Sequence, residues 1–193
     1  MDEGYPEPGQ TLKSLRTERA WSLSEAALRT GVSKAMLGQI ERGESSPTVA
    51  TLWKIATGFN APFSLFISGI GPCAPPATVL RSEKLPLWQQ RSATMQAASL
   101  FPYDKTLGLD MLTVELAPGG ISESAAHERG VIEHVVVTEG ALMLNVDDHG
   151  YRLVAGEALR FAADRPHRYH NQTQARVRFY SLIHYPLRLD RPE

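Results

Sequence analysis

Two segments in the second half of the chain concentrate the side chains that could do chemistry. The first, residues 120–140, contains His127 and Glu133, and the second, residues 156–171, contains His167. Imidazole nitrogens and carboxylate oxygens suit divalent transition ions such as Fe, Mn, Ni and Zn. Two histidines and one carboxylate also leave coordination positions open for a further ligand. These residue types therefore belong either to a metal site or to a hydrogen-bonding pocket for a small molecule.

Arg129 changes what this group could bind. Its guanidinium stays charged in proteins, and strand alternation places it on the same side as His127. A fixed cation at short range opposes metal binding in a low-dielectric pocket. The same cation could instead hold a carboxylate or similar anion in a bidentate contact. Pairing of Arg129 with Glu133 or Glu128 inside the protein is the alternative.

The segments that carry these residues alternate in hydrophobicity. Apolar residues recur at every second position of residues 112–116 and 142–146, and residues 177–183 give one face of a last strand. Many short strands at close spacing predict an all-β sandwich or barrel. In this arrangement His167 and Tyr169 point inward. The expected ligand pocket comprises His127, Arg129, Glu133, His167 and Tyr169.

Residues 21–43 predict two short helices joined by a tight turn. Ser22 and Glu25 match a capping box at the first helix, and Gly31 stands where that helix ends. Ser33 caps the next helix, whose apolar face is Met36, Leu37 and Ile40.

The opposite face of the second helix carries Lys34, Ala35 and Gln39. Lys can read guanine and Gln can read adenine in the major groove of duplex DNA. Further helices are expected over about residues 10–19, after Pro47 as the first helical residue, and around residues 63–66.

Residues 9–67 resemble the lambda-repressor-like helix-turn-helix domain of the XRE family. The resemblance rests on Gly31-Val32-Ser33, Gln39-Ile40-Glu41-Arg42-Gly43 and Pro47. It implies that Lys34, Ala35 and Gln39 face base edges, that Arg42 approaches phosphate, and that Arg16 pairs with Glu41. The implied DNA-binding set is Ser33, Lys34, Ala35, Gln39 and Arg42. Gly38 departs from the small polar residue often found there.

Residues of about 108–185 resemble the two cupin motifs. His127, Glu133 and Gly140 fit the first motif, although Arg129 replaces its second histidine. Gly156, His167 and Asn171 fit the second motif, in which Asp164 replaces a glycine. The resemblance implies that a metal, if bound, is held by His127, Glu133 and His167.

The two resemblances predict a multidomain α + β chain. A five-helix, all-α lambda-repressor-like domain at residues 9–67 precedes a Pro/Gly-rich linker at 68–80 and an all-β cupin (a double-stranded β-helix or jelly-roll barrel) at 81–190. With 193 residues and 42% apolar content, the chain can hold two small domains. Residues 10–67 contain seven Lys or Arg against four acidic residues, although the whole chain has a net charge of −1.

A net charge of +3 is small for one copy to bind DNA, because affinity rises with the number of phosphates neutralised. We therefore expect a homodimer on a palindromic operator. The sequence has no apolar run long enough to span a bilayer and no signal peptide at its acidic N-terminus. Its single cysteine, Cys73, fits a reducing cytoplasm and an incidental role.

These observations predict a cytoplasmic DNA-binding transcriptional regulator, not an enzyme, and a repressor on the basis of resemblance. The cupin would sense a small molecule such as an amino acid, amine or organic acid, and thereby alter operator binding. Two alternatives stay open. One is a cupin enzyme, dependent on Zn, Fe, Mn or Ni, fused to a DNA-binding domain, and the other is a DNA-binding dimer that needs no ligand.

Overall fold

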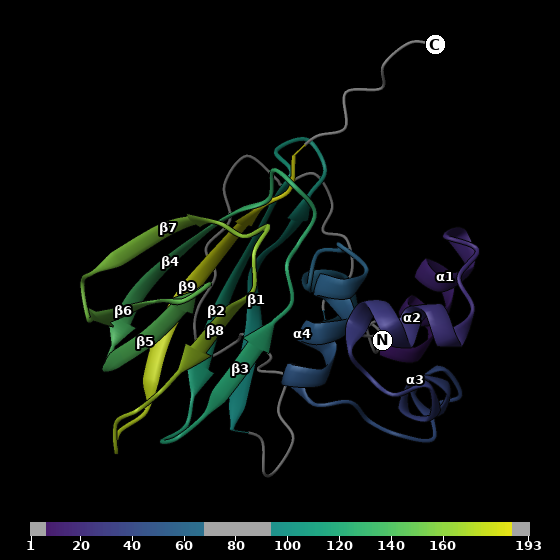
Figure 1. Ribbon diagram of the computed structural model, residues 1–193, viewed down its shortest axis with the longest axis horizontal. Coiled ribbons are helices and arrows are strands. Elements are labelled where there is room, and N and C mark those ends of the chain that lie inside the picture. Colours follow the sequence, from purple (N-terminus) through teal and green to yellow (C-terminus); the bar gives the residue numbers. More distant parts are fainter. Residues whose placement is uncertain (1–6, 68–93, 187–193) are drawn as a thin grey trace, which may run out of the picture.

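The computed structural model describes residues 7–67 and 94–186, and these form a helical domain beside a β-sandwich (Figure 1). The helices are α1 (Pro8–Glu18), α2 (Leu23–Thr30), α3 (Lys34–Glu41), α4 (Val49–Gly58) and α5 (Ser64–Ile67). The predicted five-helix domain is thus confirmed. Within the described residues, no helix is long and apolar enough to cross a membrane.

Side-chain caps fix where the central helices begin. The hydroxyl of Ser22 accepts from the Glu25 N–H at 3.1 Å, and that of Ser33 accepts from the Met36 N–H at 3.2 Å. The Glu25 carboxylate bonds to Arg29 instead of returning to the cap, so only half of the capping box forms. Gly31 closes α2 in the left-handed conformation at φ 67°, which glycine adopts without steric cost.

The core of the helical domain lies between α1, α3, α4 and α5. Leu12, Leu37, Ile40 and Leu52 are almost completely buried there. Met36 was expected on this apolar face but is 42% exposed, because the buried face of α3 passes through Gly38 instead. Pro47 precedes the cap residue Thr48 of α4 and is not the first helical residue.

The strands are β1 (Met95–Asp104), β2 (Leu109–Leu116), β3 (Ile121–Ser124), β4 (Ile132–Glu139), β5 (Ala141–Val146), β6 (His149–Val154), β7 (Ala158–Ala162), β8 (His167–His170) and β9 (Val177–His184). They form a five-stranded sheet in the order β1-β2-β9-β4-β7 and a four-stranded sheet in the order β3-β8-β5-β6. All pairings are antiparallel, as a cupin jelly roll requires. The predicted sandwich is confirmed.

Alternation along the strands fills the space between the two sheets. Val177, Phe179, Ser181 and Ile183 of β9 are all buried, in agreement with the predicted inward face. Gly140 turns β4 into β5 at φ 78°, where an added Cβ would lie 2.7 Å from a backbone oxygen. The motif glycine therefore serves the turn that connects the two sheets.

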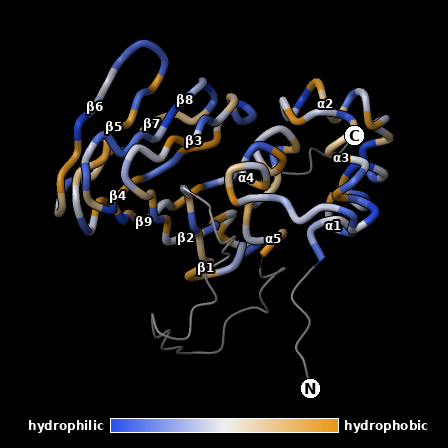
Figure 2. The backbone as a smooth tube through the Cα atoms, turned by 90° about the horizontal axis from the view of Figure 1, so that it is seen from below, coloured by the Kyte–Doolittle hydropathy of each residue, from blue (hydrophilic) through white to orange (hydrophobic). Residues whose placement is uncertain are grey.

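The helical domain packs directly on the sandwich through α4 and α5 (Figure 2). The indole N–H of Trp53 in α4 donates to the Ser124 hydroxyl of β3 at 2.5 Å. The Ser64 N–H at the start of α5 donates to the Asp110 carboxylate of β2 at 3.0 Å. These buried polar contacts join the two domains. The predicted linker at residues 68–80, with Cys73, lies outside the described residues.

Candidate functional site

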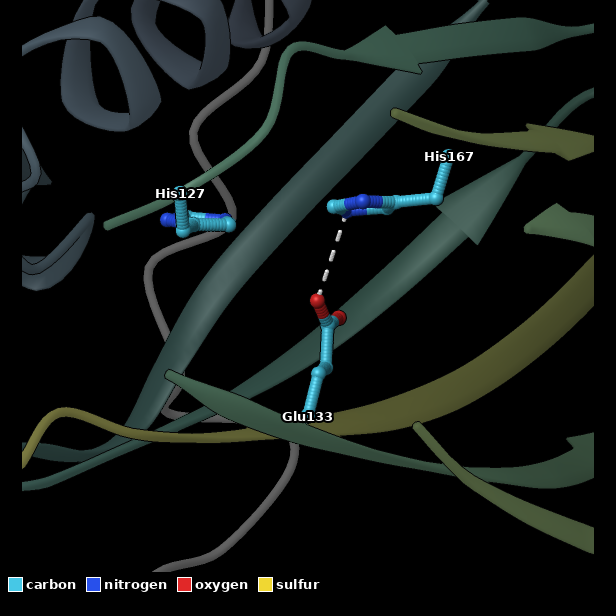
Figure 3. Close-up of side chains that lie close together, drawn as sticks. All are labelled: His127, Glu133 and His167. Carbon is cyan, nitrogen blue, oxygen red and sulfur yellow. Dashed lines mark ion pairs between the residues drawn. The ribbon is translucent and has the colours of Figure 1, made fainter. Parts of the chain in front are cut away.

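His127, Glu133 and His167 lie together between the two sheets (Figure 3). One ligand atom from each residue falls within 4.8 Å of the others, and all three residues are buried. Glu133 comes from β4, His167 begins β8, and His127 stands in the segment between β3 and β4. The His127 and His167 rings are nearly parallel, with centroids 5.8 Å apart. The structure thus brings together the three residues that the resemblance implied as metal ligands.

The Glu133 carboxylate is held by one of its two oxygens. Tyr169 and Ser181 donate their hydroxyl hydrogens to Oε1, the latter at 2.6 Å. Among the described residues Oε2 has no hydrogen-bond partner, and it lies 3.5 Å from Nε2 of His167. One oxygen is thus fixed and the other is directed at the histidines.

His167 shows the same division into one held atom and one free atom, whereas His127 has neither ring nitrogen held by a described residue. Nδ1 of His167 lies 3.0 Å from the Arg165 carbonyl oxygen, which can only accept, so Nδ1 donates this bond and Nε2 is directed at Glu133. Both ring nitrogens of His127 are buried without a partner among the described residues. Burial, with a smaller contribution from His167, lowers the pKa of His127 to about 3. Its imidazole is therefore neutral at pH 7.

This pattern fits a divalent transition ion. Unpartnered buried polar atoms cost free energy in an apolar interior. Here they are imidazole nitrogens of two histidines and one carboxylate oxygen, which are ordinary ligand atoms for Fe, Mn, Ni or Zn. The bonds to the far side of Glu133 and of His167 are those that orient metal ligands.

Arg129 does not take part, and the expectation that it enters the pocket is wrong. The chain between β3 and β4 is a loop, so strand alternation does not apply at Arg129, and its side chain is exposed. The electrostatic argument against a metal at His127 thereby loses its basis. Tyr169, the remaining predicted pocket residue, is fully buried and stacks on Phe179 at 5.4 Å.

The second candidate site is the outer face of α3. Ser33, Lys34, Ala35 and Gln39 are all exposed on it. Arg42 is exposed just beyond the helix, and its guanidinium makes an ion pair with Glu44 at 2.7 Å. Arg16 of α1 makes a bidentate contact with Glu41 at 2.6 and 2.9 Å, as the resemblance implied. This pair holds α3 against α1.

Comparison with known proteins joins the two sites in one family. The helix-turn-helix family HTH_3 matches residues 12–66, and the cupin-domain family Cupin_2 matches residues 112–183. The HTH-type transcriptional regulator SutR of Escherichia coli K12 is 55% identical over 176 residues, which cover 91% of this chain and 93% of SutR. The chain belongs to the helix-turn-helix transcriptional regulators with a cupin domain.

Two other relatives share the whole arrangement of this regulator. The HTH-type transcriptional regulator PuuR of E. coli K12 is 26% identical over 180 residues, covering 93% of this chain and 95% of PuuR. A crystal structure of an HTH_3 family transcriptional regulator from Vibrio cholerae is 38% identical with a TM-score of 0.71. That likeness covers 93% of this chain and 96% of the other. The order of helical domain and cupin is therefore common to these regulators.

Sequence reasoning missed three residues of this regulator that support the triad or the domain boundary. Ser181, which bonds to Glu133, is the one polar residue in the inward face of β9, and that departure was a usable signal. Asp110 is likewise a charge within an apolar strand. For Trp53 no signal was available, because an apolar residue on α4 equally predicts an ordinary core position.

Proposed function

We propose that this regulator reads duplex DNA through α3 and that its DNA-binding residues are Ser33, Lys34, Ala35, Gln39 and Arg42. The observation that carries the proposal is the exposed polar face of α3, held in place by the Arg16–Glu41 pair. A helix that presents short polar and basic groups fits the major groove. Arg42 would then leave its exposed ion pair with Glu44 to bind a phosphate. Breaking an exposed ion pair costs little free energy in water.

Selection from a random duplex library with the full chain gives the operator, against which variants are measured by fluorescence anisotropy. Gln39→Ala and Lys34→Ala are each expected to weaken specific binding by about 1–3 kcal/mol. Lys105→Ala, at an exposed lysine in the β1–β2 turn, is the matched control and leaves binding unchanged. Unaltered affinity in both α3 variants would place the reading face elsewhere.

We also propose that the regulator acts as a homodimer on a palindromic operator. The support is the modest net charge of +3 over residues 10–67, which a dimer doubles. Light scattering should give twice the chain mass of 21.3 kDa. An isolated half-site should bind far more weakly than the palindrome. A monomeric mass on the operator excludes this part of the proposal.

For the cupin, we propose that His127, Glu133 and His167 hold a divalent transition ion. The support is that their unpartnered buried atoms converge and that Arg129 is exposed, away from the triad. A bound ion would supply a Lewis-acid position at the centre of the sandwich. Elemental analysis of protein purified without added metal should give about one ion per chain, and His127→Ala should lose it.

The ion would serve sensing rather than turnover in this proposal. The supporting fact is that SutR, similar over nearly the whole chain, is named a transcriptional regulator. We infer that the occupied cupin alters operator affinity by favouring one conformation of the dimer. Repression is the expected mode. Operator binding measured with loaded and stripped protein tests the coupling, and equal affinities would leave the alternative of a ligand-independent dimer.

A further inference from the structure

A cavity of about 670 Å³ lies between the helical domain and the four-stranded sheet, beside the triad, and His167 is among its lining residues. The helical domain contributes the end of α2, the Gly31 turn and Lys54 of α4. The sheet contributes residues from β3, from β8 and from the β5–β6 hairpin. The volume lies within the range of about 300–1,000 Å³ that small-molecule sites occupy. The cavity thus borders both domains.

Its walls carry charges of both signs without partners. Lys54 and Arg168 supply two cations, and Glu123 and Asp148 supply two anions. Among the described residues, none of these four side chains makes an ion pair. The other charged lining groups are engaged, since Arg29 pairs with Glu25 at 2.8 Å and Asp147 with Arg165 at 3.2 Å.

The sheet side of the cavity is an ordered row. Glu123 of β3, Arg168 of β8 and Asn145 of β5 are direct cross-strand neighbours in the ladder. They face away from the sandwich core, whereas Ser122 and Tyr169 beside them are buried inside it. Asn145 Oδ1 has no hydrogen-bond partner within the part of the chain that the structure describes. Anion, cation and amide therefore stand side by side on rigid strands, opposite Lys54.

We propose that this cavity binds a small zwitterion, a molecule that carries both a carboxylate and an ammonium group. A ligand with charge of one sign would satisfy one pair of wall charges and be repelled by the other. A zwitterion can give its carboxylate to Lys54 or Arg168 and its ammonium to Glu123 or Asp148. Such charge-assisted hydrogen bonds are the stronger kind.

The position of the cavity gives this ligand a regulatory role, and that role rests on the proposed DNA-binding function. Gly31 lies in the turn that joins α2 to α3, so a ligand here touches the turn that sets the recognition helix. Binding across the boundary favours the arrangement of the domains that brings both walls within reach. Of the metal triad, only His167 lines the cavity, and its side chain is fully buried; His127 and Glu133 do not line it.

The experiment is calorimetric titration of the full chain with the twenty common L-amino acids as probes. For each probe that binds, the matching amine without its carboxylate and the matching acid without its amino group are titrated too. At least one amino acid should bind, and both truncated analogues should bind at least about tenfold more weakly, since each lacks one charge-assisted contact.

Variants locate the binding. Lys54→Gln and Asp148→Asn should each weaken binding of the same amino acid about tenfold or more. Lys105→Gln, at an exposed lysine in the β1–β2 turn that does not line the cavity, should leave it unchanged. Absence of binding by every amino acid overturns the proposal, as does binding that survives both cavity variants. Stronger binding of a diamine or dicarboxylate overturns the ligand class.

Operator binding by the ligand-free protein separates this inference from the proposed function. If the chain binds its operator but no zwitterion, only the cavity assignment fails. If it binds the zwitterion at Lys54 and Asp148 but no DNA sequence, the cavity assignment holds and the proposed function fails.

Discussion

Glu133 shows at the scale of single residues how a carboxylate is prepared for a ligand. Two hydroxyl donors, from Tyr169 and Ser181, saturate Oε1, and Oε2 is left facing His167. An apolar interior favours a carboxylate only where donors or cations compensate its charge. The hydroxyls compensate one oxygen, and a bound ion would compensate the other.

Tyr169→Phe is therefore expected to weaken metal binding at the triad by about tenfold or more, as loss of a bond that orients a ligand does. Ring packing against Phe179 survives the change, because only the hydroxyl is lost. Tyr180→Phe on the opposite face of β9 is the matched control. The affinity is measured by competition with a chromophoric chelator. Equal metal affinity in wild type and Tyr169→Phe would contradict the role given to this hydroxyl.

Asp110 should make the stability depend on pH. Burial raises its pKa to about 6 from 3.8, although N–H and O–H groups of Ser64 offset part of the effect. Tyr103 and Tyr185 are the other titratable groups facing it. The folded state binds the extra proton between pH 4 and 6, so stability falls as pH rises through that window, by about 3 kcal/mol in total.

Urea unfolding at pH 4 and pH 7 measures this difference. Asp110→Asn removes the ionisable group. When pH falls from 7 to 4, the free energy of unfolding of the wild type should therefore rise by about 3 kcal/mol relative to that of the variant. Asp148→Asn, at an exposed carboxylate, corrects for the loss of one negative charge. If wild type and Asp110→Asn differ in free energy of unfolding by the same amount at both pH values, Asp110 does not have a raised pKa.

The residues of the triad could be predicted from sequence, but the position of Arg129 could not. His127, Glu133 and His167 have spacings that a recurrent motif fixes, whichever way the loop between them runs. The direction of Arg129 was inferred from strand periodicity, which fails where β3 ends at Ser124. Loop geometry depends on tertiary contacts, and local pattern carries little information about it.

At the scale of elements, the contacts of α2 with α3 and with α4 depend on small residues. A Cβ at Gly38 would lie 3.7 Å from Leu23 and 3.1 Å from the end of the exposed Arg42 side chain. A Cβ at Gly58 would lie 2.6 Å from a backbone oxygen of Arg29. A flexible side chain can move aside, whereas helix backbone cannot.

Gly38→Ala should thus stabilise the helical domain by about 0.5–1 kcal/mol, the usual gain of alanine over glycine inside a helix. Gly58→Ala should instead destabilise it, since backbone of α2 must shift to admit the methyl group. Thermal unfolding of the two variants beside wild type gives the signs. A loss of stability in Gly38→Ala comparable to that in Gly58→Ala would mean that α2 and α3 lie closer than described.

Element types followed from sequence because caps and periodicity are local. Ser22, Ser33 and Gly31 mark helix ends through hydrogen bonds and a backbone angle that involve neighbouring residues only. The burial of Gly38 in place of Met36 depended on how closely α2 approaches α3. That distance is a tertiary property, so the predicted apolar face of α3 was partly wrong.

At the scale of the whole molecule, a short chain of contacts links the triad to the helical domain. Glu133 accepts from Tyr169, and the Tyr169 ring meets the Trp53 ring edge-on at 6.3 Å. Trp53 is part of α4, and its indole N–H donates to Ser124 of β3. A ligand that binds only the folded state stabilises whatever unfolds together with its site. Metal bound in the sandwich should therefore protect α4 as well.

Hydrogen exchange read by mass spectrometry tests this expectation. Metal at a hundred times its Kd adds about 2.7 kcal/mol, which slows exchange about a hundredfold for amides that open only by global unfolding. Wild type should show this slowing in both β4 and α4.

Trp53→Phe breaks the bond to Ser124. In this variant bound metal should still slow exchange in β4, and most of the slowing in α4 should be lost. Trp21→Phe, whose ring packs on Phe59 within the helical domain, is the control and should retain both. Protection confined to the strands in wild type would mean that the domains unfold independently, and the cupin could then reach the DNA-binding helices only by a route other than Trp53.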